Sequence, residues 1–464
     1  MDRDRETSTR EISASPPPRI SDSDPSAPRF STQIAWTFGV RLLMTVNSVV
    51  AGVIVARWLG AEGLGQLAVI NVSVATIVQL ASIGLPSANT YFIAQDSRHL
   101  AAAAINSLLF SLIVGCLLAL GLTGLAVWRP DWFGSISPRL IGVAAVSIPF
   151  QLLTLIGLNI FLALGRIRRF NLLDLAGQVF VLINALVVLV ILKAGLSALV
   201  SLNTATSVLI GVLIVVLVAT HGTTLKDKRR WRPDLALLRR MMSYGIKFHI
   251  SILAGALIFR ADLLVVNHFR GSSEAGVYSV ASQVAMMLML LPGVIATLLF
   301  PRVTAEQDVR GETTCLVSRH TAFVMLVCCL AAIPFSYLLP LLYGRAFSDV
   351  PWQILILLPG VYLIGIESVL VQHLNAIGLP RAIPLFWLVT LLINIILVFA
   401  LVPRFGARGA ALASTISYAL IFILIARQFR ASTGRPLADA LLMRGGEFRR
   451  LLVPRDFRQS RGTL

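Results

Sequence analysis

HGTTLKDKRRWRPDLALLRR, residues 221–240, divides the chain into two apolar halves. About six long apolar segments lie on each side of this basic stretch. Residues of the two halves also match at a nearly constant offset, because Gly60 and Gly271 are 211 positions apart, and so are Gly65 and Gly276. A spacing shared by several pairs indicates a duplication. We therefore interpret residues 221–240 as the linker between two related lobes.

The composition predicts a membrane protein. Of the 464 residues, 56% are hydrophobic and only 13% are charged, whereas about a quarter of the residues in a soluble domain are charged. Apolar runs of about twenty residues recur, and a helix of that length crosses the ~30 Å hydrocarbon core of a bilayer. Because no alternation typical of barrel strands appears, the spans should be helices. We predict an all-α integral membrane fold of about twelve transmembrane helices in two pseudo-symmetric six-helix lobes.

These patterns divide the chain into five parts. Residues 1–30 are rich in Ser, Pro, Asp and Arg, and we expect a disordered cytoplasmic tail because such a segment cannot bury a core. The N-terminal lobe should comprise residues 31–220, with helices 1–6, and residues 221–240 should form the basic cytoplasmic linker. The C-terminal lobe should comprise residues 241–430, with helices 7–12. Residues 431–464 should form a basic cytoplasmic tail that lies on the lipid surface.

The charges and the cysteines argue against several classes of function. A formal net charge of +18 could indicate nucleic-acid binding. However, most of the 40 lysines and arginines fall in the tails, the linker and the loops that share a side with them, as the positive-inside rule requires. The four cysteines lack the paired spacing of a metal site and suit packing in apolar segments. Because no paired carboxylates, nucleotide-binding loop or metal cluster appears, we predict a protein without enzymatic activity, cofactor or metal.

Two of the expected helices carry polar residues along one face. In the helix expected over residues 34–59 and in that expected over residues 241–266, these residues recur at helical spacing. A cation that faces lipid is costly, so both faces should line an aqueous cavity. Alternatively, Arg41 is close enough to the cytoplasmic end to reach the membrane surface. The same helical periodicity places Arg260 on the opposite face of its helix, away from the cavity. The predicted cavity residues are Arg41, Thr45, Ser48, Lys247 and Ser251.

Two carboxylates within expected helices are candidates for coupling or release. Asp262 shares the face of Lys247 in the outer third of its helix, and Glu367 lies in the helix expected over residues 353–374. A carboxylate at that depth costs a few kcal/mol unless it is hydrated, paired or protonated. Asp262 could repel an anionic substrate at the outer side or bind a coupling ion. A structural hydrogen-bonded pair with a neighbouring helix is the alternative.

Three turns resemble those of a known family. ARWLGAEGLGQLA, residues 56–68, resembles the helix 1–2 turn of bacterial polysaccharide-exporting flippases of the MOP superfamily, which also includes MATE drug exporters and lipid II flippases. GLP at residues 84–86 is similar to the same pattern, and PRFGARGAALAS, residues 403–414, resembles the helix 11–12 turn. The resemblance covers about residues 31–430 and implies a MOP- or MATE-like fold.

The resemblance also implies a function. A protein of this kind translocates a polyprenyl-pyrophosphate-linked oligosaccharide from the inner to the outer leaflet of the bacterial cytoplasmic membrane, by alternating access, for cell-surface polysaccharide biosynthesis. Its partners would be the lipid-linked oligosaccharide, membrane lipids, a polysaccharide polymerase and glycosyltransferases. In this reading Arg41 and Lys247 bind the pyrophosphate. Two alternatives stay open: a lipid II flippase, whose relatives usually have two more helices, and a MATE-type multidrug exporter, which would need acidic cavity residues.

Overall fold

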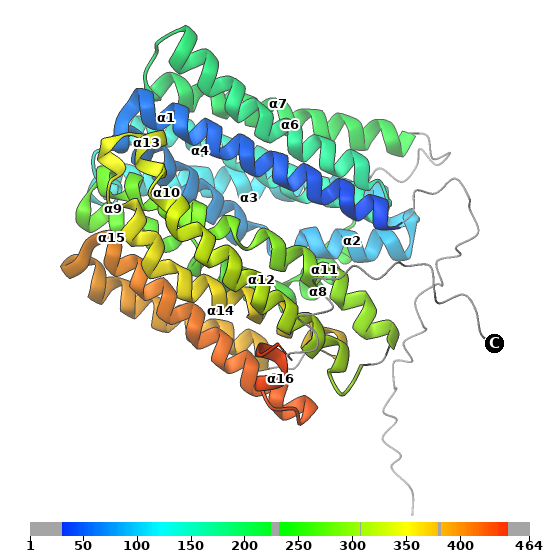
Figure 1. Ribbon diagram of the computed structural model, residues 1–464. Coiled ribbons are helices and arrows are strands. Elements are labelled where there is room, and N and C mark those ends of the chain that lie inside the picture. Colours follow the sequence, from blue (N-terminus) through cyan, green and yellow to red (C-terminus); the bar gives the residue numbers. More distant parts are fainter. Residues whose placement is uncertain (1–29, 224–231, 307, 379–381, 444–464) are drawn as a thin grey trace, which may run out of the picture.

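The computed structural model describes residues 30–223, 232–306, 308–378 and 382–443, and every regular element in these ranges is helical. The helices run side by side in one bundle, with α7 (Leu196–Thr223) along one edge and α15 (Ala382–Thr433) along the opposite edge (Figure 1). Ten helices in the described ranges are long and apolar enough to cross a membrane. The predicted all-α, multi-pass membrane fold is therefore confirmed. Three parts of the expected segments lie outside the described residues: residues 1–29 of the N-terminal tail, residues 224–231 of the linker and residues 444–464 of the C-terminal tail.

The described first half of the chain forms seven α-helices, which short loops and 3₁₀ turns join. A π-helical turn, Leu186–Ile191, directly follows the sixth of them. The helices are α1 (Phe30–Ala81), α2 (Leu85–Gln95), α3 (Leu100–Trp128), α4 (Pro138–Ala145), α5 (Ser147–Ala163), α6 (Ile167–Ala185) and α7.

In the described second half, two of the candidate spans each run over two consecutive α-helices. The helices are α8 (Leu235–Ile258), α9 (Ala261–Arg270), α10 (Ser272–Met287), α11 (Leu290–Glu306), α12 (Glu312–Ser336), α13 (Leu339–Tyr343), α14 (Val350–Ala376), α15 and α16 (Ala438–Leu441).

The two longest helices are sharply bent at glycines. α1 has a non-helical residue at Gly60 (φ 70°, ψ −173°) and α15 has one at Gly406 (φ 60°, ψ −141°), and positive φ favours glycine. A Cβ atom placed on Gly409 would lie 2.5 Å from the Leu401 carbonyl oxygen. Residues eight positions apart in a straight helix are separated by ~12 Å, so the chain reverses at this bend. Counting each bent helix as two spans would give the expected twelve, which remains a prediction.

Backbone conformations repeat between the two halves. Gly271 has φ 83° and ψ 171°, close to the values of Gly60, which lies 211 positions earlier. Gly65 and Gly276 also make a reciprocal contact. A Cβ on Gly65 would lie 2.8 Å from the Gly276 nitrogen, and a Cβ on Gly276 would lie 2.9 Å from the Gly65 nitrogen. This reciprocity supports the inferred duplication, and the division into two lobes remains a prediction.

The two halves of the chain touch at both ends of the bundle. At the end that contains Gly60, called the Gly60 end, the Ser135 and Ser272 hydroxyl oxygens lie 3.1 Å apart. At the opposite end, called the Tyr91 end, the rings of Tyr91 and Tyr244 stack with their centroids 4.5 Å apart. The middle of the bundle, where the candidate site lies, is between these two contacts.

Candidate functional site

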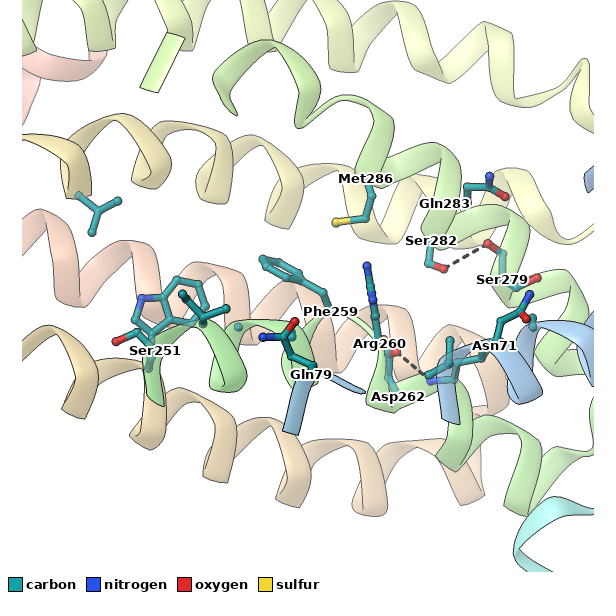
Figure 2. Close-up of a pocket in the computed structure, with 18 of the residues that line it drawn as sticks. Asn71, Gln79, Ser251, Phe259, Arg260, Asp262, Ser279, Ser282, Gln283 and Met286 are labelled. Atoms are coloured by element: carbon teal, nitrogen blue, oxygen red, sulfur yellow. Dashed lines mark hydrogen bonds between the residues drawn. The ribbon is translucent and has the colours of Figure 1, made fainter. Parts of the chain in front are cut away.

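A cavity of about 1290 Å³, called the main cavity, lies between the second part of α1 and helices α8, α9 and α10. It extends toward the Tyr91 end, where Phe300 of α11, Asn375 of α14 and Ile383 of α15 line it. Amide, hydroxyl and charged side chains share its wall with apolar ones (Figure 2). Its polar lining residues are Asn71, Gln79, Ser251, Arg260, Asp262, Ser279, Ser282, Gln283 and Asn375.

Arg260 stands at a break between two helices. α8 ends at Ile258, α9 begins at Ala261, and Arg260 itself is non-helical with φ −138° and ψ −28°. Figure 2 shows its side chain extending from this break toward Met286 on α10. The helical periodicity that placed Arg260 away from the cavity assumed an unbroken helix over residues 241–266. Because the helix breaks, that expectation was wrong and the guanidinium lines the cavity.

The charge of Arg260 is uncompensated within the described part of the chain. Its side chain is exposed, and no carboxylate oxygen among the described residues lies within ion-pairing distance of it. The side chains of Asn71 and Gln79, on α1, line the same space and make no hydrogen bond to described residues. Free amides and a free cation together form a surface suited to a polar anionic group.

A second cavity, of about 490 Å³, adjoins the main cavity. The two share Asn71, Gln79 and Arg260. Helices α1, α5, α6 and α7 form its wall, which is rich in amides and hydroxyls. Its other polar lining residues are Ser147, Gln151, Thr154, Asp174, Gln178, Asn184, Asn203, Thr204, Thr206 and Ser207. Arg260, where the two cavities meet, is thus accessible from both.

The candidates on the first part of α1 are engaged with neighbouring groups. Arg41 pairs with Asp174 of α6, with 3.0 Å between Nη1 and Oδ2, and its guanidinium carbon lies 6.0 Å from the centroid of the Phe170 ring. The Thr45 hydroxyl donates to the Arg41 carbonyl oxygen at 2.9 Å. The Ser48 hydroxyl accepts a hydrogen bond of 2.7 Å from Gln283 Nε2. None of these three lines either cavity, although Asp174 and Gln283 do.

Of the two predicted cavity residues on α8, one lines the main cavity and the other has a side chain outside the described residues. Ser251 lines the main cavity, as Figure 2 shows. Lys247 belongs to α8, and its side chain lies outside the described residues. The prediction that Arg41 and Lys247 bind the same anion is therefore not tested. In this structure Arg41 is paired with an acidic residue, Asp174.

Asp262 is buried in a hydrogen-bonded cluster at the wall of the main cavity. Its carboxylate accepts from the Tyr278 hydroxyl, from Ser414 Oγ at 2.9 Å and from the Leu263 backbone nitrogen at 2.8 Å. Glu367, in α14, is also buried and lines neither cavity. Its Oε1 atom has no hydrogen-bond partner among the described residues. The contacts of Asp262 match the structural alternative considered for it.

Helical periodicity did not identify Asn71, Gln79 and Asp174 as site residues, and the sequence indicates only some of them in another way. Asn71 and Gln79 are amides within an apolar run, an unusual placement that marks a polar environment. Asp174 follows a basic turn and has no such signal, because its pairing with Arg41 spans 133 positions of sequence. No group of three or more His, Cys, Asp or Glu side chains placed to hold a metal ion occurs in the part of the chain that the structure describes.

Solved structures of similar fold are membrane transporters. One is the inward-facing conformation of a multidrug resistance MATE family transporter of the MOP superfamily, with a TM-score of 0.69, 16% identity, and coverage of 84% of this chain and 96% of that one. The other is the lipid II flippase MurJ in an inward closed conformation, with a TM-score of 0.69, 16% identity, and coverage of 88% and 89%. The MOP-type fold expected from the turns is confirmed.

Sequence comparisons place the chain within a family. It is 31% identical over 176 residues to the "Probable flippase AglR" of Haloferax volcanii, which covers 36% of this chain and 37% of that protein. The chain therefore aligns with less than half the length of this relative. The profile of a family described as "Polysaccharide biosynthesis protein" matches residues 31–307, more than half of the chain. This protein belongs to the polysaccharide biosynthesis protein family.

Proposed function

We propose that this protein is a flippase that moves a polyprenyl-diphosphate-linked oligosaccharide from the inner to the outer leaflet of the bacterial cytoplasmic membrane. The observation that carries the proposal is the free guanidinium of Arg260 where two polar-lined cavities meet in a membrane-spanning bundle. Family membership and the name of the Haloferax relative support the same conclusion. The product would serve cell-surface polysaccharide biosynthesis.

The physical problem for such a protein is the headgroup. A diphosphate and its sugars cannot enter hydrocarbon without losing their hydration, which costs many kcal/mol for an ion. A polar cavity replaces part of that hydration. Two opposite unit charges 4 Å apart attract by about 4 kcal/mol at an effective dielectric of 20, so one free cation contributes substantially. The guanidinium of Arg260 also offers a bidentate fork that matches phosphate oxygens.

Arg260, Asn71 and Gln79 form the proposed headgroup site because their side chains line both cavities. We retain Ser251 and Lys247, both on α8, as further substrate contacts. Arg41, Thr45 and Ser48 would contact substrate only in a conformation that releases the Arg41–Asp174 and Ser48–Gln283 contacts. Asp262 and Glu367 are retained as groups for coupling or release.

Alternating access would move the headgroup past Arg260. The main cavity extends toward the Tyr91 end, so this conformation would receive substrate from that side. The Tyr91 end would be cytoplasmic, because the basic linker and the basic C-terminal tail belong there under the positive-inside rule. The residues 31–220 and 241–430 would then rock as two lobes. A polymerase and glycosyltransferases would act before and after the transport step.

A multidrug exporter for organic cations suits this site less well. In the described part of the chain, the two carboxylates that line the cavities, Asp174 and Asp262, are already paired or hydrogen-bonded. Arg260 would repel a cation from the point where the cavities meet. The similar solved structures share the fold and leave the substrate open.

Replacement of Arg260 tests this function. Protein reconstituted into liposomes with a fluorescent polyprenyl-diphosphate-linked sugar should expose that lipid to a membrane-impermeant reagent. Arg260→Gln should slow exposure at least about tenfold, since a hydrogen bond to a charged group contributes about 1.5–3 kcal/mol. Arg260→Lys should retain part of the rate because it keeps the charge. Arg139→Gln, which removes an exposed cation outside both cavities, is the matched control. Equal rates for Arg260→Gln and wild type would reject the proposal.

A further inference from the structure

One arm of the main cavity, at its Tyr91 side, combines aromatic rings with polar side chains. Trp387 of α15 and Phe259 at the end of α8 line this arm, with their ring centroids 6.4 Å apart and their planes at 67°. The six-membered ring of the indole lies over Gly255, because a Cβ placed there would be 3.4 Å from the nearest indole atom. The indole therefore packs directly against α8. We call the part of the cavity lined by Trp387, Phe259, Ser251 and Asn375 the aromatic arm.

The polar side chains of the aromatic arm have unused hydrogen-bonding capacity. The Asn375 side chain lines the cavity and makes no hydrogen bond to a described residue. The Ser251 hydroxyl makes no hydrogen bond to another described residue either. Polar side chains without partners favour a ligand that forms hydrogen bonds with them.

We propose that the aromatic arm binds a sugar ring of the lipid-linked oligosaccharide while Arg260 holds the diphosphate. A pyranose presents an apolar face of C–H groups, which packs on an aromatic ring, and a rim of hydroxyls, which donate and accept hydrogen bonds. Trp387 supplies the apolar surface, and Asn375 and Ser251 supply the polar partners. The inference rests on the proposed flippase function and adds the residues that recognise the glycan.

The spacing along α8 suits this division of roles. Ser251 precedes Arg260 by nine residues, which corresponds to ~13 Å along a helix. That length accommodates a sugar ring next to a diphosphate. Phe259 directly precedes Arg260, so the arm begins where the proposed diphosphate site ends.

The prenyl chain is the other apolar part of such a substrate. It has no hydroxyl or amide and would leave the Asn375 and Ser251 side chains without a hydrogen-bond partner. The aromatic arm therefore suits a sugar better than a lipid chain. A binding experiment separates the two, because the lipid chain can be kept constant while the sugar is present or absent.

The test measures binding to full-length protein in lipid nanodiscs. The probes are a polyprenyl diphosphate and the same lipid carrying one N-acetylhexosamine. Wild type should bind the sugar-bearing probe more tightly. Trp387→Leu should weaken binding of that probe about tenfold, which corresponds to about 1.4 kcal/mol, and leave the bare diphosphate unchanged. Trp387→Phe should restore most of the affinity. Asn375→Leu should also act on the sugar-bearing probe alone.

Trp352→Leu is the matched control, because Trp352 is 56% exposed and lines neither cavity. Equal loss of both probes in Trp387→Leu would show that Trp387 packs the helices, and would overturn the sugar site. Binding of both probes to wild type with the same affinity would also overturn it and leave the flippase proposal intact. Failure of wild type to bind either probe would reject both proposals.

Discussion

Arg41 Nη1 lies 3.0 Å from Asp174 Oδ2, so the cation on the first part of α1 is neutralised by an acid on α6. The pair is partly exposed, with 40% of the Arg41 side chain and 25% of the Asp174 side chain accessible. Both residues belong to the first half of the chain. In this conformation, Arg41 joins two helices of that half and contacts neither cavity directly.

This pair should be detectable as an energetic coupling. Arg41→Gln and Asp174→Asn should each lower thermal stability, and the double variant should lose less than the sum of the two. We expect a coupling of about 0.2–1 kcal/mol, because a partly exposed ion pair is screened by solvent. Unfolding followed by tryptophan fluorescence measures it. Strict additivity would mean that the pair contributes nothing to the fold.

The cluster around Asp262 gives a second prediction. Asp262→Ala should destabilise the protein by about 1–3 kcal/mol, because it leaves the buried Tyr278 and Ser414 hydroxyls without their shared acceptor. Asp262→Asn keeps the shape and one acceptor oxygen, so it should fold better than the alanine variant.

The asparagine variant also tests coupling and release. If Asp262 carries a coupling ion or repels the substrate, transport by Asp262→Asn should be slower and should depend on pH differently between about pH 6 and pH 8, where a coupled carboxylate would exchange protons. Rates are measured in liposomes against wild type. An unchanged rate and pH profile would leave Asp262 with a purely structural role.

The contact between α1 and α10 predicts sensitivity to a single methyl group. In Gly276→Ala the new Cβ would lie 2.0 Å from the Ala61 carbonyl oxygen, and this backbone atom cannot move without shifting α1. We expect the variant to lose about 1–3 kcal/mol of folding stability, the usual range for overpacking.

Gly124→Ala in α3 is the control, since a Cβ there would meet nothing within 4 Å. It should be neutral or slightly stabilising, because alanine favours a helix over glycine by about 1 kcal/mol. Thermal denaturation in detergent distinguishes the two variants. A fully stable Gly276→Ala protein would show that the helices at this end separate readily.

The topology prediction concerns the two sides of the membrane. Twelve spans with both termini in the cytoplasm place the turn at Gly195 outside and the end of α15 inside. Reporter fusions after Gly195 and after Arg430, read by enzymes active only in the periplasm or only in the cytoplasm, should give opposite signals. The same signal at both positions would contradict this topology.

The sequence by itself determined the class of fold and the positions of the main turns. Long apolar runs can only be helical spans in a membrane, because every backbone polar group must be satisfied within the segment. Gly60 and Gly406 lie in turns that the sequence marked, and both have positive φ, a local property that side chains oppose. The offset of 211 positions between Gly65 and Gly276 indicated a duplication that their reciprocal contact supports.

The tertiary structure decided which charges reach the cavity. Helical periodicity placed Arg41 on the cavity face and Arg260 away from it, yet Arg41 pairs with Asp174 and Arg260 lines both cavities. Periodicity assumes a continuous helix, and whether a helix breaks at Arg260 depends on how α8 and α9 each pack against other helices. The partner of Arg41 lies 133 positions away in sequence. Contacts of that range arise only when the helices assemble, so no local pattern of residues specifies them.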